Sequence, residues 1–186
     1  SESTATFWTE SYAQRVFECL PDNSAKQIIV WNPGCGKGFE SYCLACVLKK
    51  RYPDAKIRLY AQDVDLLNVS NAPSLKVSED YANTWLSPYL SKTANGSLTF
   101  SQEIKDSIMF EYHDCKNTNA LPMVDIVFAR DILSLLDEKA QENVVADFLE
   151  KMKGNAVAFV GDNESMPASF GFGEKSVGNF VAYNKD

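Results

Sequence analysis

Strand-like apolar runs alternate with longer amphipathic segments along most of the chain. The runs bounded by turn residues are typical of strands and cover residues 27–31, 56–61, 97–101, 108–112, 124–129, 156–160 and 178–183. Helical spacing of apolar residues covers residues 6–20, 39–51, 65–72, 81–86 and 140–152, and we expect Gly154 to cap the last helix. Strands that alternate with helices pair in parallel through right-handed crossovers, so the pattern predicts an α/β sheet with helices on both faces.

No internal repeat and no interdomain linker interrupts this pattern. We therefore expect one domain over residues 1–186, with residues 73–106, where the periodicity is mixed, as a candidate small inserted subdomain. Apolar residues make up 45% of the chain and charged residues 23%, which is ordinary globular usage and argues against disorder.

The charge of the chain narrows the classes of partner. The net charge of −7 argues against nucleic acid and against an anionic membrane surface, which leaves small molecules and proteins. No apolar run approaches the roughly 18 residues that span a bilayer, so we expect no membrane insertion. Five cysteines, an odd number without dense spacing, favour reduced thiols and a cytoplasmic location.

A glycine-spaced loop between the first strand and the second helix carries the strongest local signal. Gly34, Gly36 and Gly38 permit a tight turn and let a ligand approach backbone that no Cβ shields. The dinucleotide fingerprint wants its third glycine at the position of Phe39, and the loop lacks the Gly-Lys-Ser/Thr ending of a phosphate loop. The spacing is similar to the glycine loop of class I methyltransferases.

Asp63 is the second part of the cofactor argument. It ends the next strand, where a carboxylate can accept hydrogen bonds from both hydroxyls of a ribose. The alternative is that Asp63 is the N-cap of the helix that begins near Asp65. Together with the glycine loop, Asp63 favours a cofactor that contains ribose.

Several segments match one family in order and spacing. They are Ala-Gln-Asp-Val-Asp at 61–65, Asp-Cys at 114–115, Val-Asp-Ile-Val-Phe-Ala-Arg-Asp at 124–131, and Gly-Asp-Asn-Glu at 161–164. From about residue 6 to residue 183 the chain resembles the catalytic domain of the CheR family, which methylates glutamate side chains on chemotaxis receptors. The resemblance covers the catalytic domain and does not include the separate N-terminal helical domain of the family.

The resemblance implies a class I methyltransferase fold, with an antiparallel C-terminal strand, that binds S-adenosylmethionine or S-adenosylhomocysteine. It places Asp63 on the ribose, and Asp114 and Cys115 at the adenine. The full set of cofactor-binding residues that it implies is Gly34, Gly36, Gly38, Glu40, Asp63, Asp114, Cys115, Arg130 and Asp131. It implies no metal, and its partners would be chemoreceptors or other components of the chemotaxis array.

The departures from the family gather on the substrate side. Thr9 stands where the family has an arginine near the transferring methyl group, and Leu135 stands where it has a tyrosine. Phe39 replaces one of two paired glutamates, and Asp131 replaces an asparagine. Threonine has neither the positive charge of arginine nor its guanidinium, which can donate two parallel hydrogen bonds to a carboxylate. We therefore expect impaired methylation and a role as an interaction module. The alternative is an active protein-glutamate O-methyltransferase with different substrate contacts.

Other chemistry-bearing residues have simpler interpretations. Cys43 and Cys46 are expected to be small buried residues rather than a redox or metal pair, and His113 to lie beside a strand end by chance. Among the aromatic residues, Phe7 and Trp8 either cover the cofactor pocket or belong to the ordinary core, as Tyr42 and Trp85 do.

Overall fold

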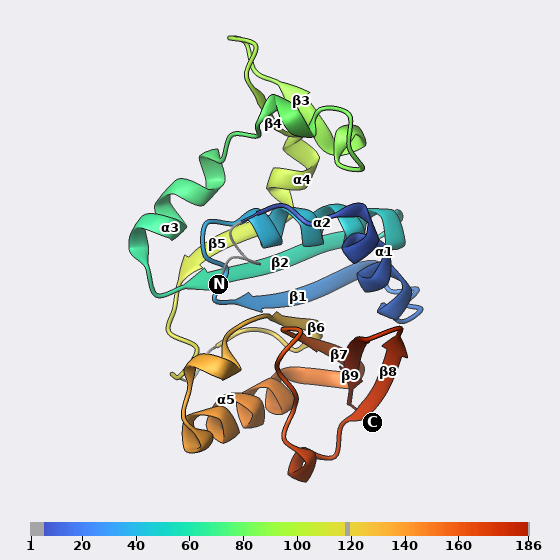
Figure 1. The fold of residues 1–186 in the computed structure, drawn as a ribbon, viewed down its shortest axis with the longest axis vertical. Helices are drawn as coiled ribbons and strands as arrows, with labels where there is room; N and C mark the ends of the chain where they lie inside the picture. The colour runs from blue at the N-terminus through green and yellow to red at the C-terminus, as the bar shows by residue number, and fades with distance from the viewer. Residues whose placement is uncertain (1–5, 118–119, 186) are drawn as a thin grey trace.

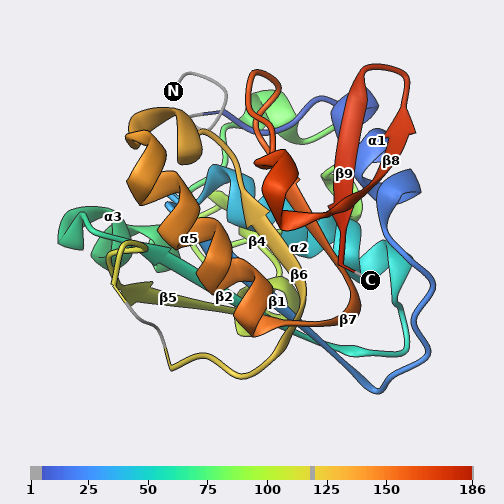
Figure 2. The ribbon, with the colours of Figure 1, turned by 90° about the horizontal axis from the view of Figure 1, so that it is seen from below.

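Seven strands form one central sheet in the computed structural model, which describes residues 6–117 and 120–185. The strand order is β5-β2-β1-β6-β7-β9-β8 (Figures 1 and 2). The strands are β1 (Gln27–Pro33), β2 (Lys56–Asp63), β5 (Ile108–Tyr112), β6 (Val124–Ala129), β7 (Met152–Val160), β8 (Gly173–Val177) and β9 (Phe180–Asn184). The outermost residues of the predicted domain, 1–5 and 186, lie outside the described residues.

The sheet is parallel except at one strand. β1 pairs in parallel with β2 on one side and with β6 on the other, so the chain reverses its winding direction between β1 and β6. β9 is antiparallel to both β7 and β8. The predicted mostly parallel α/β sheet with an antiparallel C-terminal strand is therefore confirmed.

Helices cover both faces of the sheet, as the sequence pattern predicts. α1 (Glu10–Cys19) and α2 (Phe39–Arg51) pack on one face, and α5 (Glu138–Lys151) packs on the other (Figure 2). α3 (Leu66–Asn71) contacts β2 and β5. Two hydrophobic clusters fill the space between the layers, and the larger one contains α1 and α2. Among the described residues, no helix has the length and apolar character needed to cross a bilayer.

The segment before β5 contains a second, two-stranded sheet. β3 (Leu90–Lys92) and β4 (Leu98–Phe100) form an antiparallel hairpin, followed by α4 (Gln102–Asp106), and project beyond the main sheet in Figure 1. Phe100 ties this segment to α2, because its ring stacks on Tyr42 at 4.5 Å. The helix expected over residues 81–86 is wrong: short 3₁₀ turns at Glu79–Tyr81 and Ser87–Tyr89 replace it, since Pro88 cannot continue an α-helix.

Two helix boundaries and one strand also differ from the sequence pattern. α1 begins at Glu10 rather than at residue 6, because residues 6–9 run extended into the core. α5 ends at Lys151 with Met152 as its C-cap, and Gly154 lies inside β7, so the expected glycine cap is wrong. The pattern of apolar residues does not predict β8, because β8 is a polar edge strand of which no residue is buried.

Candidate functional site

The loops that follow β1, β2, β5, β6 and β7 meet at the carboxyl edge of the parallel sheet. In open α/β sheets this edge holds ligands at the point where the strand order reverses, which here lies between β1 and β6. The cofactor-binding residues expected from the sequence belong to these loops or to the first turn of α2, except Asp63, which is the last residue of β2.

The glycine loop after β1 has the backbone geometry that its sequence predicts. Gly34, Gly36 and Gly38 have φ angles of +65°, +59° and +95°, in the left-handed region that other residues rarely adopt. A Cβ on Gly34 would lie 2.9 Å from the side chain of Ile132, whereas a Cβ on Gly36 would meet nothing within 4 Å in the described chain. The backbone at Gly36 therefore faces open space that a ligand can enter.

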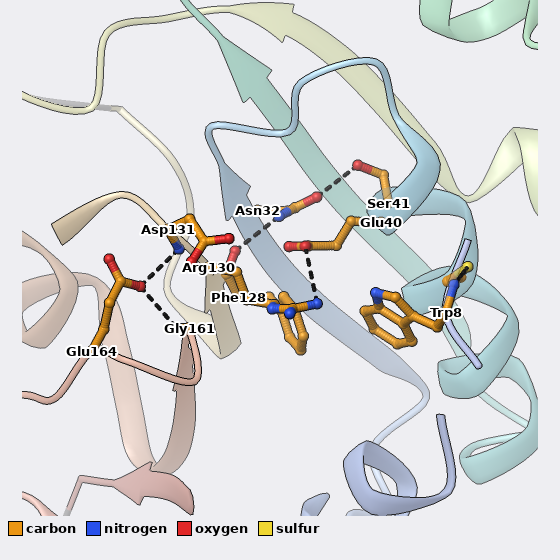
Figure 3. Close-up of polar contacts among 10 residues, drawn as sticks. Trp8, Asn32, Glu40, Ser41, Phe128, Arg130, Asp131, Gly161 and Glu164 are labelled. Carbon is orange, nitrogen blue, oxygen red and sulfur yellow. Dashed lines mark hydrogen bonds and ion pairs between the residues drawn. The ribbon is translucent and has the colours of Figure 1, made fainter. Parts of the chain in front are cut away.

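Asn32 fixes this loop to its neighbours. Its Nδ2 donates to the Phe128 carbonyl on β6 at 2.8 Å, and its Oδ1 accepts a 2.6 Å bond from the Ser41 hydroxyl on α2 (Figure 3). Asn32 is fully buried, so both bonds are shielded from water. The sequence pattern marks Asn32 only as a turn residue; its position as the one polar residue in an apolar strand end is the signal for this role.

Glu40 and Arg130 form a buried ion pair at the reversal point. The Arg130 Nη1 and Glu40 Oε2 atoms lie 3.8 Å apart, and neither side chain exposes more than 5% of its surface. Burial raises the pKa of Glu40 to about 8, although the Arg130 charge opposes this rise. The guanidinium of Arg130 also lies over the ring of Tyr12, 4.4 Å from its centroid.

Four buried polar atoms in this neighbourhood have no hydrogen-bond partner among the described residues. They are Trp8 Nε1, Tyr12 Oη, Glu40 Oε2 and Arg130 Nε. Buried polar groups are nearly always satisfied in folded proteins, so a cluster of unsatisfied ones at a strand-end site indicates where a polar ligand fits.

Asp63 lies at the end of β2, beside the glycine loop. Its Oδ1 accepts a 2.7 Å bond from the Val64 N–H, and its Oδ2 accepts a 3.0 Å bond from the Asn68 side chain. The N-cap of α3 is Asp65, which accepts from the Leu67 N–H at 2.9 Å, so the N-cap alternative for Asp63 is wrong. Asp63 remains partly exposed at the site.

The loop after β5 carries Asp114 and Cys115. Asp114 Oδ1 accepts from the Lys116 N–H at 3.0 Å, and Cys115 is partly buried against the hydrophobic cluster that contains α5. The N–H of His113 donates to the Asp63 carbonyl at 3.0 Å and so joins the ends of β5 and β2. The structure thus brings Asp114 to the Asp63 side of the site, away from the Glu40–Arg130 pair.

Glu164 holds the loops after β6 and β7 together. Its carboxylate accepts three bonds of 2.7 Å, from the backbone N–H groups of Asp131, Ser134 and Gly161. Figure 3 shows the bonds to Asp131 and Gly161. These bonds fix Asp131 in a left-handed conformation with φ +60°. The sequence offered Glu164 as part of a motif, but its three partners lie up to 33 residues away.

The two altered positions have local roles. Thr9 is the N-cap of α1, where its hydroxyl accepts from the Tyr12 N–H at 3.1 Å. Leu135 ends a short turn after β6 and is 82% exposed. Phe39 turns toward Phe7, with ring centroids 4.7 Å apart, and packs against the larger hydrophobic cluster.

Cys43 and Cys46 are fully buried free thiols, as expected from the sequence, and Cys43 Sγ accepts the backbone N–H of Trp8 at 3.3 Å. Phe7 and Trp8 both belong to the core. Trp8 also borders the site: Figure 3 shows its indole beside Arg130 and Glu40. Trp8 is therefore a core residue that lies beside the Glu40–Arg130 pair, and a role in covering a cofactor pocket stays a prediction.

A family model described as the CheR methyltransferase SAM-binding domain matches residues 2–177. The chain belongs to this family. It is 26% identical over 168 residues to chemotaxis protein methyltransferase 2 of Vibrio cholerae, covering 84% of this chain and 58% of that protein. It is 20% identical to the chemotaxis protein methyltransferase of Borreliella burgdorferi, covering 86% of this chain and 60% of that protein. The chain thus spans about three-fifths of the length of these CheR relatives.

Solved structures support the same fold at low sequence identity. The glycopeptide N-methyltransferase MtfA complexed with sinefungin superposes with a TM-score of 0.58 and 11% identity, covering 92% of this chain and 57% of that one. The same enzyme complexed with S-adenosylmethionine gives a TM-score of 0.53 at 11% identity, covering 90% of this chain and 55% of that one. The sheet of this CheR domain is thus a class I methyltransferase sheet.

Proposed function

We propose that this CheR domain binds S-adenosylmethionine, transfers its methyl group poorly to receptor glutamates, and acts in chemotaxis signalling as an interaction module. The partners we propose are chemoreceptors or other components of the chemotaxis array, and the proposed location is the cytoplasm. The proposal rests on one observation about the two altered positions. Thr9 caps helix α1, and the side chain of Leu135 is exposed to solvent.

The cofactor side of the site fits the proposed ligand. The aliphatic chain of the cofactor would lie against the open backbone at Gly36. Asp63 would bind its ribose, and Asp114 and Cys115 would contact its adenine. Glu40, Arg130 and Asp131 would take its amino-acid end, where the unsatisfied polar atoms lie. When bound, S-adenosylmethionine supplies an electrophilic methyl group on a sulfonium centre.

The acceptor side lacks the groups that a glutamate needs. A glutamate with a pKa near 4.3 is already ionised at neutral pH, so the enzyme has mainly to align the carboxylate and hold its charge. Neither the hydroxyl of Thr9 nor the side chain of Leu135 provides a cation or a donor directed at a carboxylate. Removing one preorganised electrostatic donor typically costs on the order of 10²–10³ in rate, and here two are replaced.

The second candidate is an active protein-glutamate O-methyltransferase acting on chemoreceptors. Arg130 favours it, because a guanidinium remains at the site with its Nε–H unpartnered within the described chain. In that case the carboxylate of the substrate would be held by residues other than those at positions 9 and 135.

Calorimetric titration with S-adenosylmethionine and S-adenosylhomocysteine tests the cofactor step. We expect micromolar binding, and no binding at millimolar ligand would refute a cofactor-binding domain. Methyl transfer to receptor fragments then separates the candidates: transfer at a rate typical of chemotaxis methyltransferases would refute the impaired function.

The double variant Thr9→Arg plus Leu135→Tyr sharpens this test. Gain of transfer in a domain that binds the cofactor would show that only the acceptor side is deficient. Binding without any gain would place a further defect elsewhere in the acceptor site.

A further inference from the structure

We propose that Tyr12 and Trp8 complete, with Arg130 and Glu40, a site for the zwitterionic amino-acid end of the bound cofactor. The inference rests on the proposed function and adds two residues to it. Trp8 lies just before α1, and Tyr12 lies in its first turn, so helix α1 would contribute to ligand binding directly.

The four side chains form one continuous cluster. The ring centroids of Trp8 and Tyr12 lie 4.9 Å apart, and the Arg130 guanidinium lies over the Tyr12 ring, 4.4 Å from its centroid. Arg130 reaches Glu40 at 3.8 Å. In Figure 3 the Trp8 indole, Arg130 and Glu40 converge from three different elements.

Each member of the cluster holds one buried polar atom that has no hydrogen-bond partner in the described part of the chain, although Glu40 Oε2 faces Arg130 Nη1 at 3.8 Å. All four side chains are more than nine-tenths buried. A buried donor or acceptor without a hydrogen bond destabilises the folded state, so four in one cluster are a marked departure from ordinary core packing. A ligand that satisfied them would recover this cost on binding.

The chemistry of the four atoms defines the ligand group. Trp8 Nε1 and Arg130 Nε can only donate, which suits a carboxylate, and Glu40 Oε2 can accept from an ammonium. The Tyr12 hydroxyl can do either, and burial raises the pKa of Tyr12 so that it stays protonated. One group that carries both a carboxylate and an ammonium is the α-amino-acid end of the cofactor.

The surrounding charges favour a zwitterion over a simple anion. The Asp131 carboxylate lies close enough to add to the effect of burial on Glu40, and that of Asp162 does the same for Tyr12. These carboxylates would repel a lone anion, whereas a zwitterion adds no net charge. Two cations accompany these carboxylates: Arg130 inside the cluster, and Arg15, which lies over the Tyr12 ring 5.8 Å from its centroid.

The test compares two ligands that differ by the amino-acid group. S-Adenosylhomocysteine has it, and 5′-methylthioadenosine has the same nucleoside and thioether without it. Both are titrated by calorimetry into the wild type, Tyr12→Phe and Trp8→Phe. We expect each variant to bind S-adenosylhomocysteine about tenfold more weakly and 5′-methylthioadenosine unchanged, because only a hydrogen bond to a charged group is lost.

Tyr52→Phe is the matched control. The Tyr52 hydroxyl donates to the Pro21 carbonyl at 2.6 Å and lies at the opposite end of α2 from Glu40. This variant should bind both ligands like the wild type while losing some stability. Tyr12→Phe should lose none in urea unfolding, because its hydroxyl has no partner in the free protein, so weaker binding would not reflect misfolding.

The outcomes separate the inference from the proposed function. Equal affinity of wild type, Tyr12→Phe and Trp8→Phe for S-adenosylhomocysteine would overturn the inference and leave the cofactor site intact. Equal affinity of the wild type for the two ligands would overturn the inference in the same way. If neither ligand binds the wild type, the proposed function and the inference both fail.

Discussion

At the carboxyl edge of the sheet, the residues of the proposed cofactor side and of the proposed acceptor side, called the cofactor side and the acceptor side below, are built differently. On the cofactor side, Asn32, Glu40 and Arg130 are buried and contact groups on other strands and helices. On the acceptor side, Thr9 is exposed and its hydroxyl accepts from the Tyr12 N–H of its own helix, and Leu135 is exposed to solvent. The first set belongs to the core as well as to the site, whereas the second can change at little cost to the fold.

Under the proposed function, this difference indicates which positions of the site can change at little cost to stability. A substitution in the buried set leaves unpaired polar groups, which costs several kcal/mol, whereas exposed substitutions usually change stability by less than about 0.5 kcal/mol. Loss of acceptor contacts is therefore compatible with a stable methyltransferase fold. Glu164 is the link between the sides, since it holds both Asp131 and the turn that carries Leu135.

The largest effect is expected from breaking that link. Glu164→Ala removes the acceptor of three backbone N–H groups and should lower the free energy of unfolding by about 2–4 kcal/mol. Urea denaturation measures this loss, and Glu142→Ala, at an exposed position on α5, should stay within about 0.5 kcal/mol of the wild type. Equal stability of the two variants would show that the loops after β6 and β7 hold together without Glu164.

The buried side should also respond to pH through Glu40. Its pKa is raised from 4.5 to about 8, so the folded state binds this proton more tightly than the unfolded chain. The resulting stabilisation is complete below the unfolded pKa and is lost as the pH rises through the folded pKa. Wild type should therefore lose stability relative to Glu40→Gln between about pH 5 and about pH 9, by an amount on the order of a few kcal/mol.

Denaturation of wild type and Glu40→Gln across this range measures the difference. Parallel stability curves would mean that Glu40 stays ionised throughout, and that the ion pair with Arg130 outweighs burial. The cofactor side would then carry a fixed charge pair rather than a titrating acid.

The smallest effect is expected on the acceptor side. Thr9→Arg removes the N-cap acceptor of α1 and puts a cation at the helix N-terminus, so it should cost about 1 kcal/mol. Thr9→Ser keeps the hydroxyl and should match the wild type in thermal unfolding. A loss for Thr9→Arg as large as that for Glu164→Ala would break the comparison, because position 9 would then be as structural as the buried set.

Local patterns predicted most of the fold. The apolar runs of β1 and β6 lie in the sheet as expected, because strands buried on both faces have few polar residues. The glycine spacing predicted the tight turn after β1, and the left-handed angles of its three glycines are ones that only glycine adopts without strain. The edge strand β8 was missed because burial does not select its residues, and the start of α1 was misplaced because Phe7 and Trp8 are buried without being helical.

For the candidate site, too, the sequence predicted the position of several residues but not their contacts. Sequence order alone assigned the chain to its family and brought Asp63, Glu40 and Arg130 to the same edge, since the carboxyl ends of parallel strands share that edge. The partners of these residues were decided only by tertiary structure. The Glu40–Arg130 pair, the bonds of Glu164 to Asp131 and Ser134, and the stacking of Tyr12 under Arg130 join residues far apart in the chain. No local pattern encodes such contacts, because their geometry depends on how whole strands and helices pack.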